Sequence, residues 1–197
     1  MWSSLYVAVP THTRRDARAR PTLNHSIGFA VLQEEATSDD SAPDHARPMD
    51  IRSATPEDLR DIQDLLRAVD LPAEDLTPAH LAHFLVGRDG RRLVGVVGME
   101  PTGDGALLRS LAVRPAHQGE GDGTRLLEAM ETQARHGDVE MLYLLTTSAA
   151  PFFRRRGYAT MERDALPAAI QQTKEASRLC PASATCMRKP LTSRERD

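Results

Sequence analysis

The chain has 197 residues and a mass of 21.7 kDa, and its residues are 40% apolar, 4% aromatic and 27% charged. This length is typical of one domain with a tail, and we expect a core of aliphatic side chains rather than rings. A net charge of −3 and a pI near 6.2 exclude a generalised nucleic-acid surface, because duplex binding needs a basic face that displaces counterions.

No stretch approaches the ~18–20 apolar residues that a membrane span needs, so we expect no membrane partner. Two cysteines form no disulfide framework. They indicate a reducing compartment or a protein indifferent to redox conditions, and we expect a cytoplasmic location.

Residues 1–48 differ in composition from the rest of the chain. A basic run from Arg14 to Arg20 precedes an acidic, Ser-rich stretch from Glu34 to Asp44, and hydrophobic periodicity is weak throughout. This composition predicts a disordered extension, with a docking arm for a partner as the alternative. Met49 stands immediately before the first clear strand, which is consistent with a start codon assigned too early. Residues 192–197 are expected to form a C-terminal tail.

Residues 49–191 carry clear patterns and are predicted to form one domain. A short strand is expected over residues 50–54, and Thr55 then caps a helix that has Pro56 at its first position and continues to Val69. The next elements are expected to be a second helix opened at 77–78 and continuing through residue 85, a turn over 87–90, and strands over 93–99 and 106–113.

The second half alternates helices and strands. We expect a helix over 123–135, a strand over 141–147, a short helix over 149–156, a strand over 158–163, a helix over 167–179 and a last strand over 184–189. This order predicts an α/β or α+β domain with a central mixed sheet.

Three glycines, Gly119, Gly121 and Gly123, open the helix that follows the strand ending at Val113. Glycine lets the main chain approach a ligand closely, and the free N–H groups of a helix start favour phosphate. No Gly-Lys-Ser/Thr follows, so this is not a P-loop. The dinucleotide fingerprint also fits badly, because five residues including Pro115 separate the strand from the glycines.

The run from Val113 to Gly123 resembles the acetyl-CoA loop of the GNAT N-acetyltransferase superfamily, and Phe152–Tyr158 is similar to a segment downstream of that loop. The resemblance covers residues 49–191. It implies a single domain of the α/β (α+β) class, with a central mixed, mostly antiparallel sheet flanked by helices and strands that splay at the acetyl-CoA site.

Further segments resemble narrower groups within the superfamily. Leu144–Thr147 with Ala150–Phe153 looks like the glutamate-type amino-acid acetyltransferases. Pro167–Thr173 with Leu179–Ser183 looks most like the acetyltransferases encoded with arsenic-resistance genes.

These resemblances imply a transferase that uses acetyl-CoA as cosubstrate to acetylate a small-molecule amine, such as a glutamate-like organoarsenical. Two alternatives stay open: a degenerate member that binds CoA and senses or scaffolds, and a protein N-acetyltransferase. Homodimers are common in the superfamily, which leaves a homodimer open by analogy.

The resemblance assigns the cofactor to main-chain groups. The strand before the loop would bind the pantetheine arm, the N–H groups of the loop would bind the pyrophosphate, and one hydroxyl would lie close by. The residues so assigned are Leu111, Ala112, Val113, Gln118, Gly119, Glu120, Gly121, Asp122, Gly123 and Thr124.

Two positions depart from the family pattern. Asp122 stands where Ile, Leu or Val is usual, and with Glu120 it puts two acids beside the phosphates. Phe153 stands where many members have a Tyr that protonates the departing thiolate. Because a thiol has a pKa of about 8.5, thiolate is a tolerable leaving group, and losing this acid is expected to slow the reaction rather than abolish it.

Glu100, which ends the strand before the cofactor strand, is the candidate base, with a solvated hairpin acid as the alternative. Ser110 is expected to orient the amine or relay a proton, unless it is an ordinary packed serine. An acidic substrate would be held by arginine, whose guanidinium matches a carboxylate. The candidate substrate residues are Arg109, Thr146, Thr147, Ser148 and Arg163.

Other reactive side chains receive structural interpretations. The cluster Arg154–Arg156 is expected to be a solvated helix end, with contact to the 3′-phosphate of CoA as the alternative. Cys180 and Cys186 are interpreted as structural thiols rather than an arsenic site, because no third soft ligand accompanies them. The histidines at 80, 83 and 117 lack ligand spacing, so no metal is predicted.

Overall fold

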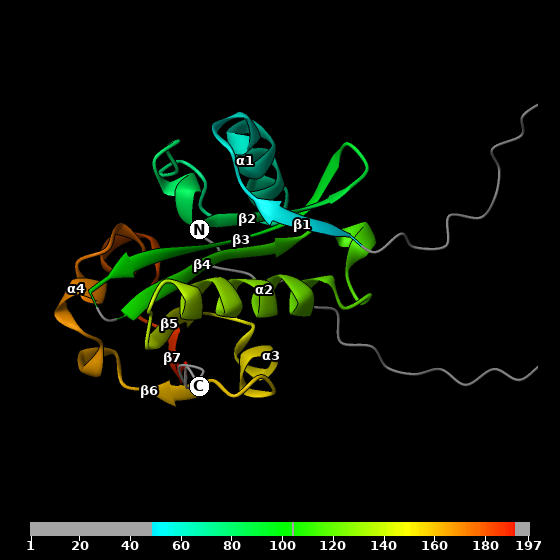
Figure 1. Ribbon diagram of the computed structural model, residues 1–197. Coiled ribbons are helices and arrows are strands. Elements are labelled where there is room, and N and C mark those ends of the chain that lie inside the picture. Colours follow the sequence, from blue (N-terminus) through cyan, green and yellow to red (C-terminus); the bar gives the residue numbers. More distant parts are fainter. Residues whose placement is uncertain (1–48, 104, 192–197) are drawn as a thin grey trace, which may run out of the picture.

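The computed structural model describes residues 49–103 and 105–191, which form one seven-stranded sheet with helices on both faces (Figure 1). The strand order is β1-β2-β3-β4-β5-β7-β6. All neighbouring strands are antiparallel except β4 and β5, which are parallel. This confirms the expected mixed, mostly antiparallel sheet. The predictions made for residues 1–48 and 192–197 lie outside the described residues.

The strands are β1 (Asp50–Ser53), β2 (Phe84–Asp89), β3 (Arg92–Thr102), β4 (Gly105–Val113), β5 (Met141–Thr146), β6 (Ala159–Met161) and β7 (Thr185–Pro190). The helices are α1 (Leu59–Ala68), α2 (Asp122–His136), α3 (Ala150–Arg154) and α4 (Ala168–Gln171). Short helical turns are η1 (Pro56–Asp58), η2 (His80–His83), η3 (Pro115–His117), η4 (Arg163–Ala165) and the π-helical η5 (Glu175–Leu179).

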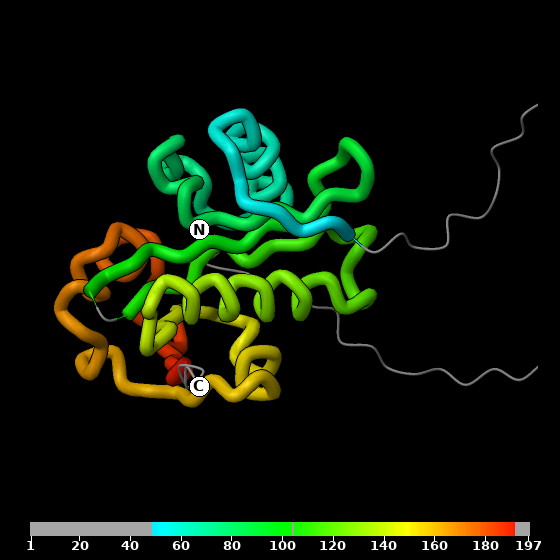
Figure 2. The backbone as a smooth tube through the Cα atoms, viewed as in Figure 1, coloured from blue at the N-terminus to red at the C-terminus, as the bar shows by residue number. Residues whose placement is uncertain are grey.

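The buried hydrophobic residues form three clusters, because the helices pack against different parts of the sheet. Helix α1 and the segment after it cover one face of β2, β3 and β4, while α2 and α3 cover the other face. The third cluster lies under α4 and η5, against Leu107 and Leu145. The backbone trace shows the α4–η5 segment, in orange, beside the green ends of β3 and β4 (Figure 2). Within the described ranges, no helix is long and apolar enough to cross a bilayer.

The predicted helix through residue 85 and the turn over 87–90 are wrong, because residues 84–89 form strand β2. The apolar spacing of Leu81, Phe84 and Leu85 fits a helix, but Phe84–Val86 are buried between β1 and β3. Phe84 packs against Gly98 so closely that a Cβ there would lie 2.3 Å from the ring. Tertiary packing therefore overrides the local pattern.

The single helix predicted over 167–179 is also wrong, since α4 ends at Gln171 and the chain resumes as the π-helical η5. Between them the Thr173 hydroxyl donates to the Ile170 carbonyl (2.8 Å) and accepts from the Ala176 amide (3.2 Å). Such side-chain bonds compete with the helical ladder. The break turns Glu175 inward, where it is buried.

Asp58 joins the start of α1 to the sheet. Its buried carboxylate accepts hydrogen bonds from Arg52 (2.8 and 2.9 Å), from Arg88 (2.7 Å) and from the Thr55 amide (2.8 Å). These bonds, above all those from Arg52, hold the pKa of Asp58 well below its usual range. Asp58 is thus a charged link between β1, β2 and α1.

We expect Asp58→Asn to lower the free energy of unfolding at pH 7 by about 2 kcal/mol, because two guanidinium groups lose their shared anion. A carboxyl with a lowered folded-state pKa stabilises the fold above its unfolded pKa and loses this effect as the pH falls. The difference between wild type and variant should therefore shrink below about pH 4, as measured by urea unfolding. The exposed Asp64, paired with Arg67 at 3.1 Å, provides the control Asp64→Asn, with a change below about 0.5 kcal/mol. A difference independent of pH would contradict this role.

Candidate functional site

Strands β4 and β5 separate partway along their length. Their parallel pairing covers only Gly105–Leu107 against Met141–Tyr143, although β4 continues to Val113 and β5 to Thr146. Beyond Leu107, the edge of β4 that faces β5 therefore has no strand partner in the described chain. The expected splay is present, and it leaves main-chain groups available to a ligand.

A bulge in β4 lies where the strands separate. Gly98 pairs with Arg109 and Val96 with Ala112, so one β3 residue opposes Ser110 and Leu111. Ser110 has φ +56°, a conformation that non-glycine residues adopt rarely. Leu111 consequently points to the same side as Leu108, into the core under α2. The bulge re-aims the strand at the opening, as bulges commonly do at functional sites.

The three residues assigned to pantetheine lie on this unpaired segment. The side chains of Leu111, Ala112 and Val113 are buried, while their strand edge faces the opening. The Val113 carbonyl accepts a hydrogen bond from the Gln118 side chain (2.9 Å), which ties the strand end to the following loop. Packing by side chains and binding by the main chain are therefore compatible here.

The glycine loop has the backbone shape expected of an anion site. Gly119 and Gly121 have φ of +90° and +93°, and α2 begins at Asp122. In the described part of the chain, the amides of residues 119–123 donate no backbone hydrogen bond. The amides of Gln118 and Thr124 differ, because they donate to Pro115 (3.3 Å) and Gly121 (2.9 Å). The amides available to a ligand are thus those of residues 119–123, one fewer than in the predicted Gln118–Gly123 set.

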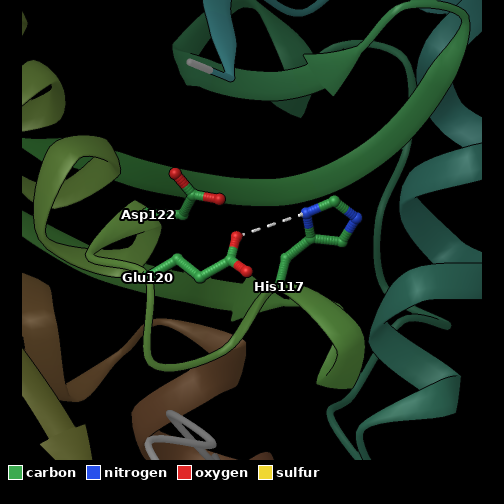
Figure 3. Close-up of side chains that lie close together, drawn as sticks. All are labelled: His117, Glu120 and Asp122. Carbon is green, nitrogen blue, oxygen red and sulfur yellow. Dashed lines mark ion pairs between the residues drawn. The ribbon is translucent and has the colours of Figure 1, made fainter. Parts of the chain in front are cut away.

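Three side chains of the loop gather in one place (Figure 3). His117, Glu120 and Asp122 bring one ligand atom each to within 4.8 Å of one another, and the His117 Nδ1 to Glu120 Oε2 distance is 3.9 Å. No partner at ligand spacing was expected for His117 from the sequence, and the two nearby carboxylates correct that expectation. Exposed acids often gather in this way without a cation, and we assign no metal here.

The two loop acids are placed differently. Glu120 is half exposed, whereas the side chain of Asp122 is 9% exposed and pairs with Arg125 at 3.3 Å. Asp122 therefore fills the usual apolar position at the helix start, where a negative charge is favourable. Its carboxylate is partly neutralised before any phosphate arrives.

The position of Arg156 differs from the solvated helix end that was expected for the whole cluster Arg154–Arg156. Arg154 and Arg155 are exposed as expected, but Arg156 lies 3.6 Å from the centre of the Phe152 ring and donates to the Thr124 hydroxyl. Its guanidinium thereby joins the end of α3 to the first turn of α2. The spacing of Phe152 and Arg156, four residues apart, was the sequence signal for this contact.

Phe153 is buried in an aromatic cluster, with its ring centre 5.1 Å from that of Phe152 and 5.3 Å from that of Tyr158. The Tyr158 hydroxyl donates to Glu131 (3.1 Å), and burial followed by the Glu131 charge raises the pKa of Tyr158. Tyr158 is therefore a structural hydroxyl and does not replace the acid that Phe153 lacks.

The side chain of Arg109 is 1% exposed, which argues against direct substrate contact. Its guanidinium donates to Asp75 (2.7 and 3.0 Å) and to Glu100, and it lies 3.2 Å from Glu175. The guanidinium that was expected to bind a carboxylate of the substrate thus pairs with three carboxylates of the protein. Sequence reasoning missed Asp75 and Glu175, because neither lies near Arg109 in the chain.

Arg163 receives a structural role in the same way. It begins η4 rather than ending a strand, and its guanidinium donates to the carbonyls of Pro181 (2.9 Å), Ala176 and Cys180 (3.4 Å). It therefore fastens the η5–β7 connection. This placement argues against substrate contact.

The hydroxyl residues after β5 separate into two groups. The Thr146 hydroxyl is buried and accepts from the Ala149 amide (3.0 Å), which shapes the turn into α3. Thr147 and Ser148 are exposed. Only these last two present an exposed surface at the end of β5.

Glu100 and Ser110 both contact Arg109. Glu100 pairs in register with Leu107, at the last β4–β5 pair, and its side chain is 21% exposed. The Ser110 hydroxyl is buried and accepts from Arg109 Nε (3.4 Å). Glu100 is therefore the more accessible of the two at the opening.

Cys180 and Cys186 are free and buried in the part of the core under η5, as expected for structural thiols. Burial raises the pKa of both thiols. Neither is a thiolate available for nucleophilic attack at neutral pH.

Comparison with known proteins agrees with this geometry. Residues 80–160 match the family model described as "Acetyltransferase (GNAT) domain". An amino-acid acetyltransferase of Azotobacter vinelandii is 31% identical over 128 residues, covering 60% of this chain and 29% of that protein. One from Pseudomonas fluorescens is 42% identical over 66 residues, covering 34% and 15%. The chain thus spans less than a third of the length of these curated relatives.

Solved structures share the fold. N-acetylglutamate synthase from Neisseria gonorrhoeae, complexed with coenzyme A and N-acetyl-glutamate, has a TM-score of 0.66 at 22% identity, covering 75% of this chain and 36% of that one. A putative acyl-CoA N-acyltransferase from Klebsiella pneumoniae has a TM-score of 0.58 at 25% identity, covering 74% and 99%. Residues 80–160 thus match the model of a GNAT acetyltransferase domain, and the described chain shares the fold of these solved structures.

We expect Gly121→Ala to weaken CoA binding about tenfold, because a side chain at φ +93° distorts the loop amides. Gly90→Ala is the matched control, since Gly90 also has positive φ (+54°) and open space around it but lies in the β2–β3 turn. Both variants should lose about 1–2 kcal/mol of stability. Calorimetry with CoA should then separate them, and equal affinities would contradict the assigned loop.

We expect Arg156→Ala to weaken binding of CoA about tenfold, through its contact with Thr124 at the loop. The substitution should weaken binding of CoA that lacks its 3′-phosphate by the same factor. A loss of affinity for intact CoA alone would instead place Arg156 at the 3′-phosphate. The exposed neighbour provides the control Arg155→Ala, with less than about a twofold change.

Proposed function

We propose that this protein is an acetyl-CoA-dependent N-acetyltransferase that acetylates the amino group of a small amino-acid-like substrate. The observation that carries the proposal is the edge of β4 that has no strand partner among residues 49–103 and 105–191. It leads into a glycine loop whose amides at 119–123 are available for a diphosphate within the same residues. The names of the relatives support an amino acid as acceptor. The Neisseria structure with coenzyme A supports the cosubstrate.

Direct transfer is the chemistry that these residues favour. The amine nitrogen attacks the thioester carbonyl, the C–N bond forms, the C–S bond breaks and CoA leaves as thiolate. Because a thiol has a pKa of about 8.5, this step does not require an acid at position 153. The amine must lose a proton, and Glu100 is the proposed acceptor because it is an accessible carboxylate at the point of splay.

A glutamate-like organoarsenical is the finer substrate that we propose, on the resemblance of Pro167–Thr173 and Leu179–Ser183 to acetyltransferases of arsenic resistance. Because Arg109 and Arg163 bond to protein groups, we no longer propose them as partners of a substrate carboxylate. Thr147 and Ser148 remain the proposed substrate contacts. We also propose a cytoplasmic location, and a homodimer by analogy with the superfamily.

An acceptor screen tests the function. We expect thiol release from acetyl-CoA with small amino acids, and we expect the arsinyl analogue of glutamate to react faster than glutamate itself. A peptide with a free N-terminus is the third acceptor, because the acidic surroundings of Arg109 would suit a cationic peptide. Preference for the peptide would indicate a protein N-acetyltransferase. Tight CoA binding without thiol release on any acceptor would indicate a sensor or scaffold and overturn the proposal.

A further inference from the structure

Four segments that are distant in sequence meet at one guanidinium. Arg109 on β4 is bound by Asp75 from the connection after α1, by Glu100 from β3 and by Glu175 from η5. Three carboxylates surround one cation, so the cluster has a net charge of −2 when all are ionised. The charge on Glu100 is therefore coupled to that of the other two through Arg109.

Glu175 is the least solvated of the three carboxylates. Its side chain is 2% exposed, compared with 9% for Asp75 and 21% for Glu100. Its Oε1 accepts from the Cys180 thiol (3.7 Å). Its Oε2 is buried and accepts no hydrogen bond among the described residues, although Arg109 Nη2 lies 3.2 Å from it. A buried carboxylate oxygen without a donor favours the protonated form.

The groups around Glu175 act on its pKa in opposite directions, and those that favour the protonated form prevail. It faces Arg109 from β4, Asp75 from the connection after α1, Glu100 from β3 and the Cys180 thiol, with His80 beside Asp75. Burial first, and then the charges of Asp75 and Glu100, raise the pKa of Glu175 to about 7 against the attraction of Arg109.

We propose that Glu175 is a positioning residue that sets the negative charge around Glu100 through Arg109, and thereby how strongly Glu100 attracts the substrate amine. This proposal rests on the proposed function. With Glu175 protonated, only two anions share Arg109, and its positive charge compensates more of the charge of Glu100. With Glu175 ionised, three anions share the guanidinium, and the added negative charge attracts an ammonium group to Glu100.

The chemical step stays balanced in this arrangement. Glu100 takes the proton that the ammonium loses, the free amine forms the C–N bond and the thiolate leaves with the electrons of the C–S bond. Glu175 exchanges its own proton with solvent as the pH changes and touches neither substrate. Its effect is a change of negative charge behind Glu100.

The kinetic test uses the full chain with acetyl-CoA and the best acceptor from the screen, between about pH 5.5 and 9. Wild-type kcat/KM should rise through pH 7 more steeply than the ionisation of the amine explains. Glu175→Gln should remove this extra rise, with a loss of about fivefold at pH 8, mainly in KM for the amine, and little change at pH 6. Glu175→Asp should restore part of the rise, because it restores a charge.

Glu131→Gln is the matched control. Glu131 is another buried carboxylate, but it lies on α2 and accepts hydrogen bonds from Lys189 (2.6 Å) and Tyr158. It should keep the extra rise. CoA affinity should stay within about twofold in all variants, which separates positioning from loss of fold. An unchanged pH profile in Glu175→Gln would overturn the proposal.

A second measurement needs no activity and so distinguishes failure of this proposal from failure of the proposed function. Protein labelled with carbon-13 at the glutamate carboxyl groups is titrated by NMR, with Glu100→Gln and Glu175→Gln used to assign the two signals. The Glu100 signal should show a step near pH 7 that disappears in Glu175→Gln. A Glu100 signal without that step, or one that keeps it in the variant, would overturn the coupling even if the enzyme is active.

Discussion

The separation of β4 from β5 after Leu107 is the constraint on which the site depends. A strand buried in a sheet normally satisfies its main-chain groups on both edges, and leaving one edge open is costly unless a ligand or water takes the bonds. Here the open edge continues into a loop in which the amides of residues 119–123 donate to no main-chain group of the described residues. One backbone path can therefore follow an elongated ligand, from its arm to its phosphates.

The side chains around this path explain why the opening keeps its shape. On one face, Leu111 and Val113 pack beneath α2, and Arg156 ties α3 to the first turn of α2. On the other face, Arg109 gathers carboxylates from three further segments. Loss of Arg109 would leave three carboxylates without their shared cation, whereas loss of one carboxylate leaves the other two paired with it.

Elements with a strong local signal were predictable. Helix α2 follows from its glycine loop and apolar spacing, and the order of strands on either side of it follows from alternating patterns. Strand β2 was not predictable, because Phe84 owes its place to Gly98, which lies elsewhere in the chain. The pairing of Glu175 was not predictable either, because its partner Arg109 lies on a distant strand. At the candidate site, the succession of strand, glycine turn and helix start was predicted, but the protein partners of Arg109 and Arg163 were not.

The amino-acid sequence alone determined that a strand, a glycine-rich turn and a helix start succeed one another between Leu107 and Leu127, because those signals act between residues a few positions apart. Only the tertiary structure decided which charges face each other. Asp75, Glu100, Arg109 and Glu175 come from separate segments, and the energy of a buried ion depends on what surrounds it rather than on its neighbours in the chain. For that reason arginines suited to a substrate carboxylate are instead bound within the protein.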